Sequence, residues 1–338
     1  MGTCHEAERD ISTSYDAAVI VDGHNDLVLS VWHGEPSKHV DLDAARAVGF
    51  AGGFFALFVP GDDFTMEPDE VPYSVPLPPA IATADARRVG LELADVFDSL
   101  DVRLARSVGD FRAGEVAAIM HLEGADPLAP DLSDLDEWYA RGVRSIGLVW
   151  SRPNAFGEGV PFRFPSSPDT GPGLTAAGAA LVAACNRLGI LVDLSHLNAA
   201  GFWDVARLSA APLVATHSNA WALCESSRNL TDDQLDAIAG SDGVVGVNFA
   251  TGFLRADGFN LPDTPMVEIV RHVDYLVERM GIDHVAFGSD FDGAVVPEEL
   301  GGVAGLPKLV DLLGYDGDER DKLTHGNWLR VLETTWNP

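Results

Sequence analysis

The stretch VIVDGHNDLVLS, residues 19–30, breaks an apolar run with one glycine and four polar residues. The residues before the break, 19–21, are apolar and β-branched, as in a buried strand. Charged side chains are costly to bury unless they are paired or bind a metal ion. His24 and Asp26 therefore either belong to a polar turn or converge with other residues on a bound ion.

Imidazole and carboxylate groups recur at the ends of other apolar runs. These are the groups that Zn²⁺ and similar divalent ions prefer as ligands. The residues are His24, Asp26, Glu123, His196, His217 and Asp290. If the runs are parallel strands of one barrel, all six side chains meet at one face. Carboxylates can also bridge two metal ions about 3.5–4 Å apart, a spacing suited to activating water for hydrolysis.

Each of these residues also has a purely structural interpretation. A histidine at a strand end is commonly a hydrogen-bonded core or capping group, and an aspartate in a turn is usually a local cap. Glu123, ahead of Gly124, could simply end a strand. These interpretations require six independent coincidences at strand ends, so the residues together favour a metal site.

Eight apolar, β-rich runs predict the strands that would position these residues. They span 19–26, 53–59, 116–124, 144–150, 189–196, 212–218, 243–249 and 284–293. Helical patterns separate most of them, which indicates a parallel sheet buried on both faces. Eight such units favour an α/β fold, a (β/α)8 TIM barrel with a binuclear metal site at the C-terminal face of its strands. A doubly wound sheet is the alternative, but no glycine-rich phosphate motif follows the first run.

Several helices are marked by their periodicity and their caps. Residues 265–280 follow the 3.6-residue period, with Thr264 and Pro265 as the cap and the first position, and residues 80–100 show the same period. Thr231 and Gln234 form a capping box. Thr175 begins a further helix.

The whole chain, 1–338, is interpreted as a single barrel domain. Residues 1–16 are polar and acidic and predict an N-terminal extension. Two segments rich in proline and glycine, 60–79 and 152–174, follow predicted strands. Loops at this end of a barrel commonly carry function, so both are interpreted as functional loop insertions.

The charge of the chain is strongly negative. Its 52 acidic residues outnumber 22 basic ones, for a formal net charge of −30, and only Lys38, Lys308 and Lys322 are lysines. A nucleic-acid partner is not expected, because phosphate binding needs clustered basic residues. The acidic surplus suits a surface kept soluble in concentrated salt, as in a halophilic host. An acidic, GC-rich proteome without salt adaptation is the open alternative.

The expected compartment is the cytoplasm. Three scattered cysteines fit a reducing environment better than a disulfide framework. The first residues lack the pattern of a signal peptide, and no apolar run reaches 18 residues. No membrane partner is expected.

Six short motifs together resemble the membrane (renal) dipeptidase family, which comprises zinc peptidases with amidohydrolase-like barrels. The motifs are DGHNDL (22–27), HLEGAD (121–126), LVDLSH (191–196), ATHS (215–218), SSRN (226–229) and GSDFDG (288–293). The resemblance extends from about residue 17 to 335. It implies a metal-dependent hydrolase with two zinc ions per chain, acting on dipeptides, and commonly forming homodimers.

The resemblance also implies roles for individual residues. One zinc would be held by His24, Asp26 and Asp290, and the other by His196 and His217, with Glu123 bridging. The two-residue spacing of His24 and Asp26 lets both side chains leave an extended segment on one side. A water bridging two zinc ions becomes hydroxide near neutral pH, and Asp290 would take its proton and pass it to the leaving amine. Arg228 resembles the arginine that fixes the substrate's terminal carboxylate, a task suited to a guanidinium fork.

One position departs from the family pattern. Where the better-known dipeptidases have a histidine thought to bind the carbonyl oxygen in the transition state, this chain has Trp150. Indole is a donor only and a poor substitute for that imidazole. The oxyanion would then fall to a zinc ion alone, or to Arg152 or Asn154 nearby, and the substrate range could differ.

Three functions follow as alternatives. The first is a zinc-dependent dipeptidase, with dipeptides that end in a D-residue among its possible substrates. The second keeps the metal site but acts on another amide, such as a lactam or an N-acyl amino acid. The third is a non-catalytic binding protein, which only Trp150 supports.

Overall fold

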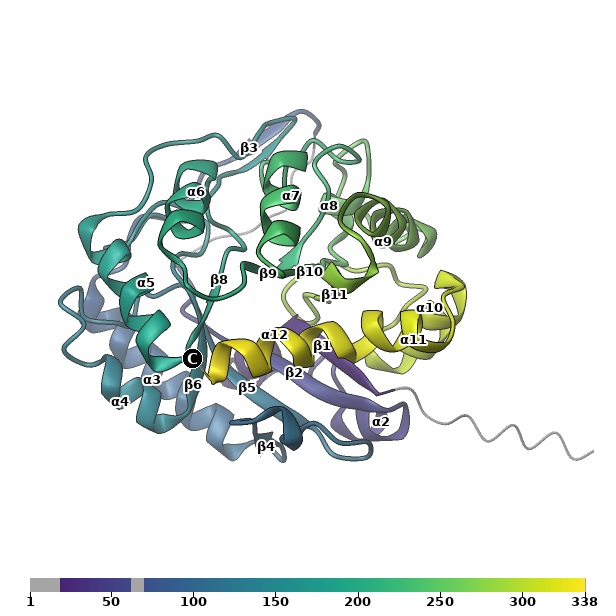
Figure 1. Cartoon of the computed structure of the whole chain (residues 1–338), viewed down its shortest axis with the longest axis horizontal. Helices are drawn as coiled ribbons and strands as arrows, with labels where there is room; N and C mark the ends of the chain where they lie inside the picture. The colour runs from purple at the N-terminus through teal and green to yellow at the C-terminus, as the bar shows by residue number, and fades with distance from the viewer. Residues whose placement is uncertain (1–18, 62–69, 338) are drawn as a thin grey trace, which may run out of the picture.

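The computed structural model describes residues 19–61 and 70–337, and its centre is a closed barrel of eight parallel strands (Figure 1). Strands β2 and β5 pair, as do β1 and β11, so the sheet closes on itself. In barrel order the strands are β1 (Ile20–Asn25), β2 (Phe50–Phe58), β5 (Ala117–Glu123), β6 (Val143–Gly147), β8 (Leu191–Asp193), β9 (Val214–Ser218), β10 (Val244–Val247) and β11 (Val285–Phe287). Each predicted run overlaps one of them, although β2 begins three residues and β6 one residue before its run. The predicted (β/α)8 fold is confirmed.

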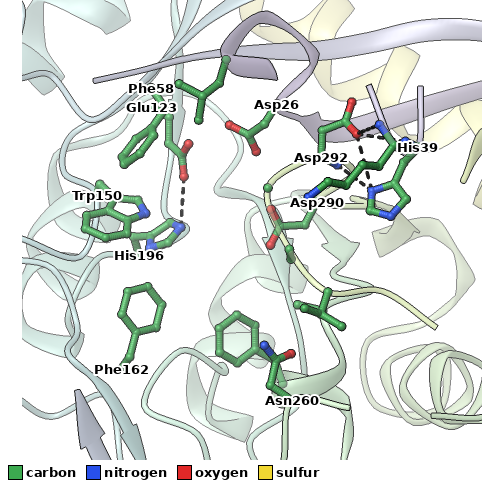
Figure 2. Close-up of a pocket in the computed structure, with 18 residues that line it drawn as sticks. Asp26, His39, Phe58, Glu123, Trp150, Phe162, His196, Asn260, Asp290 and Asp292 are labelled. Atoms are coloured by element: carbon green, nitrogen blue, oxygen red, sulfur yellow. Dashed lines mark hydrogen bonds and ion pairs between the residues drawn. The ribbon is translucent and has the colours of Figure 1, made fainter. Parts of the chain in front are cut away.

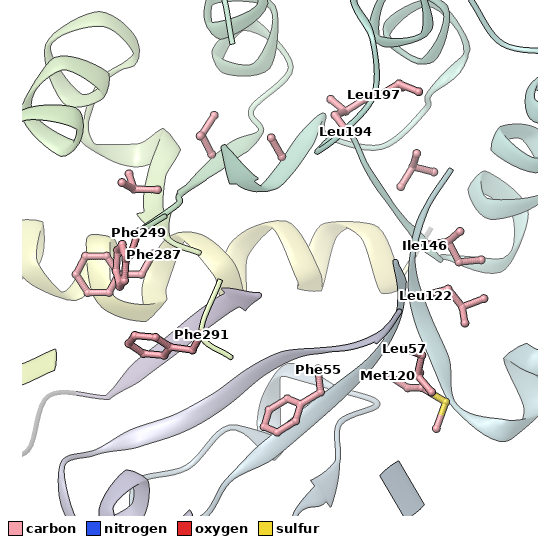
Figure 3. Close-up of a cluster of buried hydrophobic side chains, with 14 of the residues drawn as sticks. Phe55, Leu57, Met120, Leu122, Ile146, Leu194, Leu197, Phe249, Phe287 and Phe291 are labelled. Carbon is pink, nitrogen blue, oxygen red and sulfur yellow. The ribbon is translucent and has the colours of Figure 1, made fainter. Parts of the chain in front are cut away.

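Helices surround the barrel because its strands are apolar on both faces. They are α1 (Leu27–Trp32), α2 (Leu42–Ala47), α3 (Thr83–Ser99), α4 (Leu135–Arg141), α5 (Ala176–Leu188), α6 (Ala199–Leu208), α7 (Asp232–Gly240), α8 (Thr251–Leu254), α9 (Val267–Met280), α10 (Leu306–Leu313), α11 (Gly317–Asp321) and α12 (Asn327–Trp336). A layer of buried side chains fills the space between strands and helices (Figure 3). Met120, Leu122 and Ile146 belong to this layer. Among the described helices, none has both the length and the apolar character that a membrane span requires.

The helix caps follow the sequence prediction in two cases of three. Thr231 and Gln234 form the predicted capping box of α7, and the Thr175 hydroxyl accepts from the amide of Gly178 at the start of α5. The predicted start of α9 was wrong, because that helix begins at Val267. Thr264 does not cap it, since the Thr264 hydroxyl donates to the carbonyl of Leu261 at 2.6 Å.

The end of the barrel opposite the strand C-termini is filled by apolar side chains. Trp328 of α12 is fully buried there, and its indole nitrogen donates to the carbonyl of Phe287 at 2.9 Å. Phe54 packs against the indole at 5.0 Å between ring centroids. A Cβ atom on Gly23 would lie 2.6 Å from the Trp328 ring and 2.2 Å from the carbonyl oxygen of Thr216. Glycine in the DGHND motif is therefore required by close packing at the barrel centre.

The two predicted insertions pair with each other. Strand β3 (Tyr73–Val75) lies in the first and β7 (Phe162–Phe164) in the second, and they form an antiparallel ribbon outside the barrel. A further two-residue strand, β4 (Arg103–Leu104), pairs with the beginning of β5. The predicted polar extension, 1–16, lies outside the described residues, as does 62–69 within the first insertion.

Candidate metal centre

All six predicted ligands meet at the C-terminal face of the barrel. They form three overlapping groups whose ligand atoms lie within 4.8 Å of one another. The groups are His24, Asp26 and Glu123; Glu123, His196 and His217; and His24, His217 and Asp290. Because each group shares a member with the others, the six side chains form one cluster. Four of its members, Asp26, Glu123, His196 and Asp290, are labelled in Figure 2.

Glu123 lies at the centre of the cluster. Its Oε1 atom is 3.1 Å from Nε2 of His196 and 3.8 Å from Nε2 of His217. Its Oε2 atom is 3.5 Å from Nε2 of His24, which in turn is 3.4 Å from Oδ2 of Asp26. The two oxygens of one carboxylate therefore face two different sets of ligands, which is the geometry of a bridging carboxylate.

His24 shows that these donors fit a metal ion. Its ring is fully buried, and neither ring nitrogen has a hydrogen-bond partner. A buried polar atom without a partner costs about 1–3 kcal/mol, and a coordinated ion would remove that cost at Nε2. Three imidazoles and three carboxylates are also the donor types of divalent transition metals.

The electrostatics of the cluster point the same way. Burial opposes a charge on His24, but Glu123 and Asp26 together raise its pKa well above the usual range. Burial raises the pKa of Asp26 to about 7, and burial also raises the pKa of Asp290. Burial opposes the charge on Glu123 as well, but His24 and His196 hold its pKa well below the usual range. A bound cation would favour the charged form of all three carboxylates.

Two histidines are oriented by hydroxyl groups. Nδ1 of His196 lies 2.9 Å from Oγ of Ser151. Nδ1 of His217 lies 2.8 Å from Oγ1 of Thr216, and that hydroxyl donates to Oδ2 of Asp193 at 2.6 Å. Because its proton goes to the carboxylate, the Thr216 oxygen accepts from Nδ1–H of His217. Nε2 of His217 is then left without a proton and can bind a metal ion.

The loop after β11 holds Asp290 under tight steric constraint. Asp290 and His196 both have positive φ angles, 60° and 68°, a conformation that is uncommon outside glycine. The amide of Asn248 donates to Oδ2 of Asp290 at 2.8 Å. A Cβ atom on Gly293 would lie 2.1 Å from Oδ2 of Asp26 and 2.7 Å from Oδ1 of Asp290. The backbone at Gly293 thus packs directly against both carboxylates and leaves no room there for a side chain.

A cavity of about 390 Å³ opens beside the cluster and is lined by Asp26, Glu123, His196 and Asp290. This volume lies within the range of small-molecule sites. One wall is aromatic, with Trp150 packed 5.0 Å from Phe58 and 5.4 Å from Phe162. Figure 2 shows these three rings on one side of the cavity and His39 and Asp292 on the other.

The predicted substrate-binding residues have different surroundings. Trp150 lines the cavity, with its ring 5.9 Å from that of His196. Arg228 is buried behind the cavity wall, where its guanidinium donates to the carbonyl of His217 and to Oγ of Ser218. Its Nε atom has no partner. Burial lowers the pKa of Arg228 to about 10, against the effect of nearby carboxylates.

Arg152 and Asn154 do not line the cavity. The Arg152 guanidinium is fully buried and donates to Asp126 at 3.1 Å and to the carbonyl of Val59 at 2.6 Å. Asn154 donates to the same Asp126 and to the carbonyl of Leu148. These contacts hold together the loops after β2, β5 and β6.

Sequence reasoning missed several residues of the site. Asn248 follows an apolar run in the same way as the ligands, so its position was a usable signal. Thr216 and Asp193 lie inside quoted motifs, but their link to His217 depends on contacts across strands. Lys38, His39 and Asn260 also line the cavity, and nothing in the local sequence marks them.

The family model for membrane dipeptidases (peptidase family M19) matches residues 8–337. The chain belongs to this family. It is accordingly a metallopeptidase of the dipeptidase type, an enzyme that hydrolyses peptide bonds, and the family resemblance inferred from the motifs is confirmed.

Solved structures of a metallopeptidase and a probable dipeptidase agree with this membership. The chain is 46% identical to a metallopeptidase from Rhodobacter sphaeroides liganded with a phosphinate mimic of the dipeptide L-Ala-D-Ala, with a TM-score of 0.91 over 95% of this chain and 100% of that one. It is 27% identical to the probable dipeptidase PvdM from Pseudomonas aeruginosa, with a TM-score of 0.78 over 94% and 96% of the two chains. An uncharacterized protein in the pqqA 5′ region of Klebsiella pneumoniae is 57% identical over 224 residues, 65% of this chain and 83% of that protein.

Proposed function

We propose that this enzyme is a zinc-dependent dipeptidase that uses two zinc ions per chain. The observation that carries the proposal is the position of Glu123, whose two oxygens face His196 at 3.1 Å and His24 at 3.5 Å. One ion would be held by His24, Asp26 and Asp290, the other by His196 and His217, with Glu123 shared. Asp290 lies beside His24 and His217 together, so it is close to both positions.

The metal ions and Asp290 would have separate tasks in the reaction. Two bound zinc ions would supply Lewis acidity, which lowers the pKa of a water molecule toward neutral and polarises the scissile carbonyl. Asp290 is the proposed proton acceptor and passes the proton to the leaving amine. The Asn248 amide, 2.8 Å from Oδ2 of Asp290, fixes the direction in which this carboxylate points.

Arg228 is the proposed site for the terminal carboxylate of the substrate. Its Nε–H is buried without a partner, and such a donor favours binding an anion. The guanidinium packs 5.8 Å from the ring of Phe253, which lines the cavity. An anchor for the carboxylate limits substrates to two residues. The ligand of the Rhodobacter sphaeroides relative, a mimic of L-Ala-D-Ala, supports dipeptides that end in a D-residue as substrates.

The experiment is a zinc-supplemented assay of paired L,L- and L,D-dipeptides, repeated after chelation and after zinc is restored. We expect hydrolysis that chelation abolishes and zinc restores. A chelator-resistant activity would contradict the metal dependence. Turnover of lactams or N-acyl amino acids without cleavage of any dipeptide would favour the second function. Running the panel at low and high salt also tests the expected salt adaptation, which loss of fold at low ionic strength would support.

A further inference from the structure

Lys38 is the only lysine or arginine that lines the described cavity. Its side chain is exposed, so it stands where the cavity opens to solvent. The other two lysines of the chain are in ion pairs, Lys308 with Glu299 at 2.9 Å and Lys322 with Asp283 at 2.6 Å. Within residues 19–61 and 70–337, no carboxylate forms an ion pair with Lys38.

The loop that carries Lys38 is fixed to the metal cluster. Oδ1 of Asp292 accepts from the backbone amides of Lys38 and His39, both at 2.9 Å, and Oδ2 accepts from Oγ of Ser37 at 2.5 Å. The amide of Asp292 donates to Nδ1 of His39 at 2.9 Å. Asp292 is two residues beyond Asp290. The base of the Lys38 side chain is therefore held at a set position relative to the proposed reacting centre.

The carboxylates around Lys38 already have other partners. Asp26, Glu123 and Asp290 belong to the metal cluster, and Asp292 accepts three hydrogen bonds from the Lys38 loop. Lys38 therefore lines the cavity without an ion pair to any carboxylate of residues 19–61 and 70–337. The terminal carboxylate of the substrate is assigned to Arg228, so an anion that reaches Lys38 must come from another part of the substrate.

We propose that Lys38 is a specificity residue that selects dipeptides with an acidic side chain, aspartate or glutamate. This inference rests on the proposed dipeptidase function and adds its substrate class. The aromatic wall of Phe58, Trp150 and Phe162 lies across the cavity from His39, the neighbour of Lys38 (Figure 2). None of these three rings carries a positive charge that could pair with an acidic side chain of the substrate. The acidic side chain therefore points toward the Lys38 side.

The test compares isosteric substrates, Ala-Asp with Ala-Asn and Asp-Ala with Asn-Ala, in the stereochemical form that the panel favours. We expect kcat/KM to favour the acidic member of one pair by about tenfold, the scale of a charge-assisted contact at a partly exposed site. Lys38→Gln should reduce this ratio about tenfold, and Lys38→Glu should reduce it further. Higher salt should shrink the ratio in the wild-type enzyme. The matched control, Lys322→Gln, removes a lysine remote from the cavity lining and should keep the wild-type ratio.

A binding measurement separates recognition from turnover. Calorimetric titration with phosphinate mimics of Ala-Asp and Ala-Asn, in both sequence orders, should show the same preference and its loss in Lys38→Gln. An unchanged acid-to-amide ratio in that variant would overturn the proposal. An equal loss for both members of a pair would also overturn it, because it would assign Lys38 to the terminal carboxylate. Absence of hydrolysis for every dipeptide would instead refute the proposed function, and the titration would still decide the role of Lys38.

Discussion

His196 and His217 face each other through their Nε2 atoms, which are 3.1 Å apart. The opposite nitrogen of each ring is held by a hydroxyl group, from Ser151 and Thr216 respectively. Both rings are buried, and burial lowers the pKa of His196 to about 4 and that of His217 well below its usual range. Two buried imidazoles whose Nε2 atoms converge are suited to binding a metal ion between them.

Replacing Thr216 with valine should weaken metal binding without unfolding the barrel. The substitution keeps the shape of the side chain but removes the acceptor that holds Nδ1–H of His217. Losing such a contact commonly reduces metal affinity about 10–100-fold. Competition with a chromophoric chelator measures the change. Ser145→Ala is the matched control, since it removes a hydroxyl from His121, which is not a proposed ligand. Equal affinities in both variants would contradict the argument.

Replacing Gly293 with alanine should displace two proposed ligands. The new Cβ atom would lie 2.1 Å from Oδ2 of Asp26 and 2.7 Å from Oδ1 of Asp290, so both carboxylates must move. We expect loss of bound metal and at least a tenfold fall in kcat, with a melting temperature near that of the metal-free wild type. Gly240→Ala, in α7 where a Cβ atom meets nothing within 4 Å, should leave both properties unchanged. If Gly293→Ala bound as much metal as the wild type, the displacement of Asp26 and Asp290 as metal ligands would be contradicted.

Replacing Asn248 with alanine should lower kcat more than it changes KM. The variant removes the donor that lies 2.8 Å from Oδ2 of Asp290 and frees this carboxylate to rotate. A misdirected proton acceptor slows the chemical step by about 10–100-fold. Steady-state kinetics on the best dipeptide separate the two constants. A rise in KM with unchanged kcat would instead place Asn248 in substrate binding.

His272 of α9 should make folding sensitive to acid. Burial lowers the pKa of His272 to about 4. The charge of Arg271 lowers this pKa further, whereas the hydrogen bond to the Leu254 carbonyl raises it. Below pH 6.5 the His272 ring takes up a proton in the unfolded chain but not yet in the folded chain. The free energy of unfolding therefore falls as the pH drops from 6.5 to 4. The loss amounts to about 2 kcal/mol by pH 4.5.

Denaturant unfolding of the metal-free protein at pH 7 and pH 4.5 measures this dependence. His272→Gln should be less stable at pH 7, because the ring nitrogen that accepts from the amide of Ala220 is lost. The difference in the free energy of unfolding between the wild type and His272→Gln should be smaller at pH 4.5 than at pH 7. If the difference in the free energy of unfolding were the same at both pH values, the pKa of His272 would not differ between the folded and unfolded chains.

The sequence was sufficient to predict the barrel and the meeting of the six predicted ligand residues at one face, and the reason is geometric. Parallel strands of a barrel place their C-terminal ends at one face, so polar residues at those ends converge whatever their separation along the chain. The pairing of β3 with β7 could not be predicted in this way. It joins Tyr73 to Phe164 through contacts between two irregular loops, which carry no period.

The residues around the ligands depend on tertiary contacts, and there the sequence prediction was less informative. Arg152 was expected near the oxyanion because it lies two residues after Trp150. In the structure its guanidinium pairs with Asp126, a residue of another loop, and this contact cannot be inferred from local sequence. Lys38 reaches the cavity because Asp292 holds its loop, a contact between residues 254 positions apart.

Metal stoichiometry tests the central claim most directly. Elemental analysis of the zinc-loaded enzyme and of Asp26→Ala, after removal of loosely bound metal, counts ions per chain. The account predicts two zinc ions in the wild type and one in Asp26→Ala, because Asp26 serves only the ion shared with His24. One ion or none in the wild type, or two in Asp26→Ala, would contradict a binuclear centre built on these residues.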